Sequence, residues 1–130
     1  MPEIEVREIR ENVMGLFANQ QIEKGNIILM LRGNKISKPT KTSIQIGDKQ
    51  HLEDPKGGFI NHHCNPNAEI NIHSDFVGSN PTSRNEANTT ALVVAKKTIS
   101  KGDEITFNYE TTEEKLAFPF LCDCHGRLIE

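Results

Sequence analysis

The sequence contains no long apolar run. A membrane-spanning helix needs about eighteen or more consecutive apolar residues, and nothing in this chain approaches that length. The segment from Met1 to Arg10 carries charges where a signal peptide would have its apolar stretch. We therefore expect no membrane partner and no secretion by a classical signal peptide. The predicted location is intracellular, in the cytoplasm or nucleus or, after delivery, in a host cell.

Cysteine is scarce as well. The chain has three cysteines, and two of them, Cys122 and Cys124, lie too close in sequence for an ordinary structural disulfide bridge. A secreted fold held by disulfides therefore fits this sequence poorly. A reducing compartment agrees with the intracellular location.

An excess of basic residues is also missing. Fifteen Lys and Arg residues are outnumbered by eighteen Asp and Glu residues, which gives a formal net charge of -3. A general nucleic-acid binder needs positive charge to neutralise phosphates, so we expect no direct nucleic-acid partner. A basic peptide would be attracted to such a chain.

The composition is that of one folded domain with a mostly β structure. A chain of 130 residues with 35% hydrophobic and 25% charged residues fits a single globular unit. Short apolar or alternating segments predict strands at 4–6, 16–18, 27–31, 43–46, 69–72, 91–95 and 105–109. The predicted helix is short, at 112–117, and the segment 78–90 is predicted to be a long surface loop.

Two segments of the chain resemble each other. Residues 22–28 and 99–105 each place a Lys-Gly turn between apolar residues. Because glycine adopts positive φ without steric cost, each turn is expected to reverse the chain and deliver a strand. Two such matches support β structure but do not establish a repeat architecture.

The densest polar cluster is the sequence Asn-His-His-Cys-Asn-Pro-Asn at 61–67, directly after Phe59 and Ile60. Taken alone it permits a metal site, a cysteine nucleophile beside a base, a rigid turn whose amides line a ligand pocket, or a purely structural polar turn. Metal binding by His62, His63 and Cys64 together is difficult, because neighbours in an extended chain point to opposite faces.

Four segments, in this order along the chain, resemble the SET-domain family of protein-lysine methyltransferases. They are Gly-Leu-Phe-Ala at 15–18 with Ile-Glu-Lys-Gly at 22–25, the segment 59–67 that contains the polar cluster, the segment 99–109 ending in Tyr109, and Phe-Leu-Cys-Asp-Cys at 120–124. The Asn-His-x-Cys-x-Pro-Asn string is the most specific of them. The resemblance spans almost the whole chain.

The resemblance implies a mostly β, SET-type β-clip fold of several small sheets with a C-terminal pseudoknot. Residues 1–117 would form the SET domain, and 118–130 a partial post-SET-like segment of the same unit. S-adenosylmethionine would bind on one face, and a substrate lysine would reach it from the opposite face through a narrow channel. Among the cofactor-binding residues, Asn61 and His62 would contact the cofactor, Gly15 and Leu16 would lie against it with their backbone, and Phe120 would form part of an aromatic wall.

The resemblance also assigns the catalytic positions. Tyr109 would be the catalytic tyrosine, and Phe107 would occupy the place that limits the number of methyl groups, in a form that tolerates more than one. A free lysine has a pKa of about 10.4, so an apolar channel and a nearby sulfonium cation would help the amine to lose its proton. An unperturbed phenol titrates near pH 10, so Tyr109 is expected to orient the amine rather than to act as an established general base.

The end of the chain resembles a zinc-binding post-SET segment in part. Cys64, Cys122 and Cys124 match the expected cysteines, but the fourth position falls on Ile129. A structural zinc site usually has four ligands, so three thiolates would need His125, a water or another chain to complete the site. Zinc is therefore a candidate second cofactor with an incomplete ligand set, and reduced, packed thiols are the alternative.

Two further features bear on function. Val13 occupies a place where the family often has glycine, so the cofactor loop is expected to differ in shape or to bind less tightly. His51 and His73 are expected to be ordinary polar surface residues.

The predicted function is S-adenosylmethionine-dependent methyl transfer to a lysine of a protein or basic peptide, with a histone-like acceptor among the candidates. The alternatives are a catalytically inactive SET-like domain or a β-clip binding module for a peptide or other ligand. The acceptor and the oligomeric state are left open by the sequence.

Overall fold

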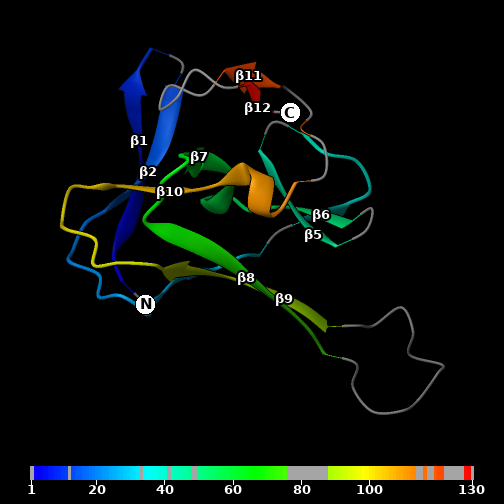
Figure 1. The fold of residues 1–130 in the computed structure, drawn as a ribbon, viewed down its shortest axis with the longest axis horizontal. Helices are drawn as coiled ribbons and strands as arrows, with labels where there is room; N and C mark the ends of the chain where they lie inside the picture. The colour runs from blue at the N-terminus through cyan, green and yellow to red at the C-terminus, as the bar shows by residue number, and fades with distance from the viewer. Residues whose placement is uncertain are drawn as a thin grey trace.

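The computed structural model describes residues 2–11, 13–32, 34–40, 42–47, 50–75, 88–113, 116, 119–121 and 128–129. These residues form short strands in several small sheets, joined by turns and one-turn 3-10 helices (Figure 1). The mostly β architecture predicted from the sequence is confirmed. No helix in the described ranges is long and apolar enough to cross a membrane.

The sheet that contains the start of the polar cluster has the strand order β1-β2-β10-β7. Its strands are β1 (Ile4–Arg10), β2 (Val13–Ala18), β10 (Glu104–Phe107) and β7 (Asn61–His62). β2 pairs with β1 on one side and with β10 on the other, both antiparallel. Gly15, Leu16 and Ala18 of β2 are buried because the strand lies inside the sheet and against the core.

A second sheet has the order β3-β9-β8 and contains β3 (Ile27–Met30), β8 (Ala68–Asp75) and β9 (Asn88–Ala95). β8 and β9 form a long antiparallel ladder that extends away from the rest of the molecule (Figure 1). The predicted loop at 78–90 is wrong at its end, because residues 88–90 belong to β9 and pair with residues 73–75. Thr89 and Thr90 are β-branched residues, which are frequent in strands, but the polar composition of the segment favoured the prediction of a loop. Residues 78–87 lie outside the described residues.

The third sheet has the order β4-β6-β5 and consists of β4 (Asn34–Ile36), β6 (Gln50–Glu53) and β5 (Ser43–Gly47). The sequence predicted only β5 among these strands. A short pair, β11 (Phe120–Leu121) with β12 (Leu128–Ile129), completes the described strands.

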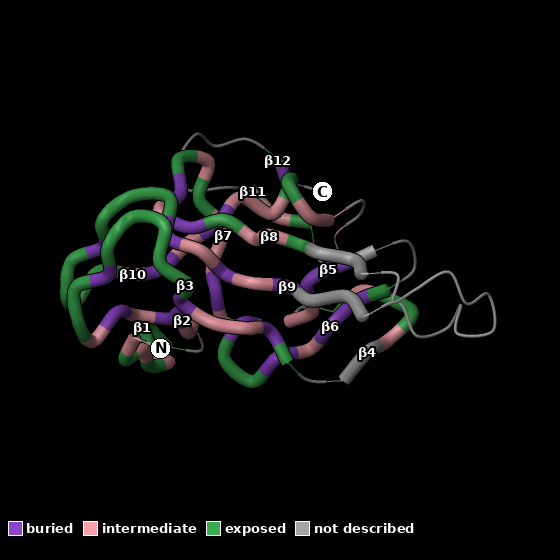
Figure 2. Tube along the Cα trace, turned by 90° about the horizontal axis from the view of Figure 1, so that it is seen from below, coloured by how far each residue is buried: buried purple, intermediate pink, exposed green. Residues whose placement is uncertain are grey.

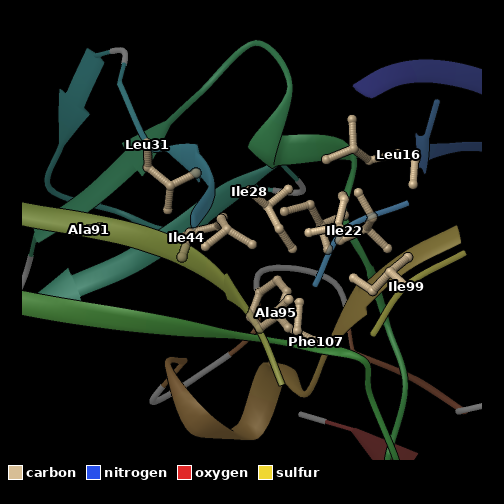
Figure 3. Close-up of a cluster of buried hydrophobic side chains, with 14 of the residues drawn as sticks. Leu16, Ile22, Ile28, Leu31, Ile44, Ala91, Ala95, Ile99 and Phe107 are labelled. Atoms are coloured by element: carbon tan, nitrogen blue, oxygen red, sulfur yellow. The ribbon is translucent and has the colours of Figure 1, made fainter. Parts of the chain in front are cut away.

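One core joins the three larger sheets. Its apolar side chains come from β2, β3, β5, β6, β8, β9 and β10 and from the turns between them (Figure 3). Buried positions follow these inner strands, whereas the turns at the periphery are exposed (Figure 2). The burial of these aliphatic side chains is the main stabilising contribution to the fold.

The two similar Lys-Gly segments lie side by side. Gly25 and Gly102 adopt positive φ, 89° and 94°, as the sequence predicts for such turns. Ile22 and Ile99, at the start of the two segments, form a β-bridge with each other, and both are buried. The internal similarity therefore marks two segments that are joined at their first residues.

The predicted helix at 112–117 is wrong for the residues that can be described, since Thr112, Glu113 and Leu116 are not helical. A 3-10 helix, η3 (Tyr109–Thr111), lies directly before them instead. Asn108 caps η3, because its Oδ1 accepts a hydrogen bond from the Glu110 amide at 2.9 Å. The observed turn therefore begins and ends before the range predicted from the sequence.

Candidate functional site

The site is built where two distant segments pair in parallel. Asn61 and His62 of β7 pair with Thr106 and Phe107 of β10, and the His63 amide donates to the Phe107 carbonyl at 3.1 Å. This pairing places the polar cluster beside the segment that ends in Tyr109, as the SET resemblance implies. The C-terminal pseudoknot itself stays a prediction.

Asn61 ties three strands together. Its Nδ2 donates to the Met14 carbonyl of β2 at 2.8 Å and to Glu104 Oε2 of β10 at 2.7 Å. Gly15 makes room for this contact, because a Cβ at that position would lie 2.8 Å from Glu104 Oε2. The glycine at 15 therefore leaves room for the side chain of Glu104 against β2.

The side chain of Asn67 forms hydrogen bonds with the backbone of β10. Its Nδ2 donates to the Glu104 carbonyl at 2.8 Å, and its Oδ1 accepts from the Thr106 amide at 2.9 Å. Asn67 thus satisfies backbone groups in the way that a neighbouring strand would. Part of the polar cluster is a rigid structural turn, which was one of the interpretations left open by the sequence.

His62 is held in one orientation by backbone and sulfur contacts. Its Nδ1 accepts a hydrogen bond from the Tyr109 amide at 3.1 Å, and its Nε2 lies 3.3 Å from Cys64 Sγ. Because Nδ1 is the acceptor, a neutral ring carries its proton on Nε2, which faces the sulfur. His62 in this state has no free nitrogen to deprotonate Cys64, so the geometry argues against a Cys64–His62 nucleophile.

Three other aromatic rings gather around Tyr109. The ring centroid of Tyr109 lies 5.0 Å from that of Phe107, 5.3 Å from that of His62 and 5.9 Å from that of Phe120. The rings of His62 and Phe120 are 5.8 Å apart. Aromatic faces attract organic cations, so this cluster is suited to a methylated ammonium or a sulfonium group.

The Tyr109 hydroxyl is fixed and stays protonated. It donates to the Ile60 carbonyl at 2.6 Å. Burial raises the pKa of the Tyr109 phenol well above its ordinary value, and the Glu113 and Glu104 carboxylates raise it further. At neutral pH the residue is therefore a neutral phenol and does not accept a proton.

Glu113, which the sequence did not single out, is the second titratable group at this place. Its Oε2 accepts hydrogen bonds from the Gln45 amide at 2.7 Å and from the Thr112 hydroxyl at 2.8 Å. Burial raises the pKa of the Glu113 carboxyl, while these hydrogen bonds and the imidazole of His51 oppose the rise. Its backbone amide donates to the Tyr109 carbonyl at 2.9 Å.

His51 corrects an expectation. It was predicted to be a surface residue, but only 5% of it is exposed, because β6 lies between β4 and β5 and turns His51 inward. Its Nδ1 has no hydrogen-bond partner among the residues described. The side chain of His73 lies outside the described residues.

A cavity of about 800 Å³ opens over these groups. It is lined by the aromatic cluster, by Glu104 and Glu113, and by residues of β2, β5 and η1 (Gly57–Phe59). Among the lining residues are Arg10, Val13, Met14, Asn61, His63 and Leu116.

The cavity brings together most of the predicted site residues. Tyr109, Phe107, Asn61, His62 and Phe120 all line it.

Gly15 and Leu16 are buried on β2 and do not line it, whereas the neighbouring Val13 and Met14 do. Val13 lies in a β strand, where a β-branched side chain is favourable. The predicted backbone contact of Gly15 and Leu16 with a cofactor stays a prediction.

The zinc prediction lies mainly outside the described residues, because Cys122 and Cys124 belong to segment 122–127. Cys64 is half-buried and its sulfur lies near His62. In the part of the chain that can be described, no group of three or more His, Cys, Asp or Glu residues could hold a metal ion. The predicted division into residues 1–117 and 118–130 likewise stays a prediction.

Comparisons with known proteins agree with this geometry. The structure resembles that of a Plasmodium falciparum protein named as a candidate histone methyltransferase, with a TM-score of 0.59 and 24% sequence identity over 82% of this chain and 96% of that chain. It also resembles KRYPTONITE in complex with mCHG DNA and S-adenosylhomocysteine, with a TM-score of 0.70 and 16% identity over 97% of this chain and 29% of that chain. A sequence search of curated proteins finds no match. The sequence matches the model of the SET domain over residues 13–110, and the chain belongs to the SET domain family.

Proposed function

We propose that this protein transfers a methyl group from S-adenosylmethionine to the side-chain amine of a lysine in a protein substrate. The observation that carries the proposal is the convergence of Tyr109, His62, Phe107 and Phe120 around one cavity. The parallel pairing of β7 with β10 brings together His62 and Tyr109, which are 47 positions apart in sequence.

The lining of the cavity fits the cofactor chemically. S-adenosylmethionine carries a carboxylate, an ammonium, a sulfonium and an aromatic base, and a volume of about 800 Å³ lies within the range of pockets for ligands of this size. Arg10 and Glu104 offer charges of opposite sign, and Phe120 offers an aromatic face. Asn61 holds the Met14 carbonyl and Glu104 in place at the wall. When bound, the cofactor supplies an electrophilic methyl carbon on a positively charged sulfur.

The residues of the chain then have to align an amine and keep it neutral. The aromatic rings exclude water and tolerate a methylated amine by cation–π attraction. The Tyr109 hydroxyl, fixed by the Ile60 carbonyl, is a neutral group that orients the amine. Alignment of this kind can lower a barrier by about 7–11 kcal/mol when the reacting atoms are held in a near-attack geometry.

Phe107 is proposed to set the degree of methylation. It is almost fully buried, and its ring packs against that of Tyr109. A phenylalanine here brings no hydroxyl that would hold a water or the amine in one orientation, so more than one methyl group is expected. A product analysis that finds only monomethyl-lysine would contradict this assignment.

A basic peptide is the proposed substrate class. The net charge of -3 and the carboxylates of Glu104 and Glu113 at the cavity favour a cationic segment. Histone-like tails are candidates on this chemistry, and an intracellular location is proposed with them. We also propose that Cys64, Cys122 and Cys124 bind zinc, which a measurement of the metal content of the protein tests.

The proposal is tested by incubating the protein with radiolabelled S-adenosylmethionine and a mixture of basic proteins that includes histones. Label on a lysine Nζ, with much less label for Tyr109→Phe, is the expected result. Cofactor binding without transfer to any acceptor would favour an inactive SET-like domain. Neither binding nor transfer would favour a β-clip binding module.

A further inference from the structure

We propose that Glu113 binds the ammonium group of the substrate lysine and accepts its proton before methyl transfer. This inference rests on the proposed function and names a residue that performs one step of it. A proton acceptor is needed because a lysine with a pKa of about 10.4 is protonated at neutral pH, and an ammonium has no lone pair with which to attack carbon.

The position of Glu113 supports this role. Glu113 lines the same cavity as Tyr109 and Phe107, and its backbone amide donates to the Tyr109 carbonyl at 2.9 Å. The Gln45 amide and the Thr112 hydroxyl both donate to Oε2. Among the described residues no donor bonds to the other oxygen, Oε1. One oxygen is therefore anchored, and the other can accept a proton.

The neighbouring titratable groups do not fill the same role. Tyr109 is a buried, neutral phenol whose hydroxyl already donates to the Ile60 carbonyl. Glu104 Oε2 is bonded to Asn61 and serves the contact between strands. His51, on β6, interacts electrostatically with Glu113, but it is not among the residues that line the cavity. Glu113 is thus the acid that combines access to the cavity with an available oxygen.

The electrostatics of the site agree with proton transfer. Burial favours the protonated form of the Glu113 carboxyl, which makes it a better proton acceptor than an exposed carboxylate. The transfer also converts an ammonium and a carboxylate into two neutral groups inside a partly buried cavity. A positively charged methyl donor nearby disfavours the ammonium and acts in the same direction.

The proton and the electron pairs are all accounted for in this step. An N–H bond of the lysine ammonium breaks, and an O–H bond forms at the Glu113 carboxylate. The nitrogen lone pair then bonds to the methyl carbon, while the electron pair of the C–S bond goes to sulfur. The methylated amine leaves in its protonated form, and Glu113 returns its proton to solvent.

The test compares Glu113→Gln with the wild type over a range of pH, using labelled methyl transfer to a lysine peptide. Glutamine keeps an oxygen that can accept from the Gln45 amide but cannot take up a proton. The turnover rate of the variant is expected to fall about 10²–10⁴-fold near neutral pH. The loss should shrink at alkaline pH, where the lysine deprotonates without help. Glu113→Asp is expected to restore part of the rate.

Two controls distinguish a lost proton acceptor from misfolding and from lost cofactor binding. Glu110→Gln removes the same charge from the exposed side of the same turn and is expected to leave the pH profile unchanged. Thermal unfolding and calorimetric titration with S-adenosylmethionine check that Glu113→Gln folds and binds the cofactor.

The outcomes distinguish the two levels of the proposal. An active wild type with a Glu113→Gln rate that is unchanged, or lowered equally at every pH, overturns the role of Glu113. A higher KM for peptide with an unchanged kcat overturns the proton transfer to Glu113, since that result leaves the residue only its charge attraction for the ammonium. A wild type that transfers no methyl group at any pH contradicts the proposed function itself.

Discussion

Replacing Asn61 by alanine should destabilise the protein by an amount that can be worked out from its contacts. The Nδ2 group makes one hydrogen bond to a neutral carbonyl, that of Met14, and one to the Glu104 carboxylate. A neutral hydrogen bond contributes about 1 kcal/mol net, and one to a charged group about 1.5–3 kcal/mol. The expected loss is therefore about 2.5–4 kcal/mol, a large fraction of the about 5–15 kcal/mol that stabilises a typical domain.

The loss can be measured by urea unfolding followed by circular dichroism, because the chain has no tryptophan and a single tyrosine to report by fluorescence. Asn65→Ala is the matched control, since Asn65 belongs to the same motif but is exposed. Its effect is expected to stay within about 0.5 kcal/mol.

Asn61→Asp provides a pH-dependent version of the same test. It would place a carboxylate within hydrogen-bond distance of Glu104 Oε2, and two like charges at that distance raise the pKa of one of them. The folded state then binds more protons than the unfolded state, so the stability of this variant should increase as the pH falls through the raised pKa. Equal unfolding free energies for Asn61→Ala and Asn65→Ala, with no pH dependence for Asn61→Asp, would refute the reasoning.

Three further predictions concern two residues of the site and two glycines. Tyr109→Phe should lower the methyl transfer rate about 10²-fold through misalignment, yet cost only about 1 kcal/mol in urea unfolding; an unchanged rate would remove the tyrosine from the mechanism. Burial raises the pKa of Glu113, so the folded state binds a proton more readily than the unfolded state, and stability falls as the pH rises through that pKa. Glu113→Gln, which carries no charge, should therefore melt at a higher temperature than the wild type at neutral pH. An unchanged or lower melting temperature would contradict a cost of burying the Glu113 carboxylate. Gly25→Ala should cost about 1–2 kcal/mol of stability for its positive φ alone, since nothing lies within 4 Å of the added Cβ. Gly57→Ala should cost about 1–3 kcal/mol because its Cβ would lie 2.3 Å from Leu31 Cδ2. Chemical unfolding of both variants checks these values, and an unchanged stability of Gly57→Ala would mean that the leucine side chain moves aside.

The sequence predicted those parts of the fold that local patterns determine. Strands with apolar alternation, such as the one containing Leu16 and the one containing Val93, and the positive φ of Gly25 and Gly102 follow from residue type alone. β6 was missed because Gln-His-Leu-Glu has no clear apolar signal, and His51 is buried only through its neighbours β4 and β5.

The candidate site was predictable through the family resemblance and not through local chemistry. Asn61, His62 and Tyr109 belong to motifs that the resemblance identifies. The importance of Glu113 depends on a hydrogen bond from Gln45, which is 68 positions away, and no local pattern signals such a contact. The position of η3 depended on the cap by Asn108, a residue that can equally be read as part of the preceding strand.

The most direct test of the central claim is a calorimetric titration of the protein with S-adenosylmethionine. We expect saturable binding at one site per chain, retained by Tyr109→Phe because that residue orients the amine, and weakened in Asn61→Ala under conditions where the variant is folded. Heat that never saturates, or binding that is unaffected by Asn61→Ala, would contradict the assignment of this cavity to the methyl donor.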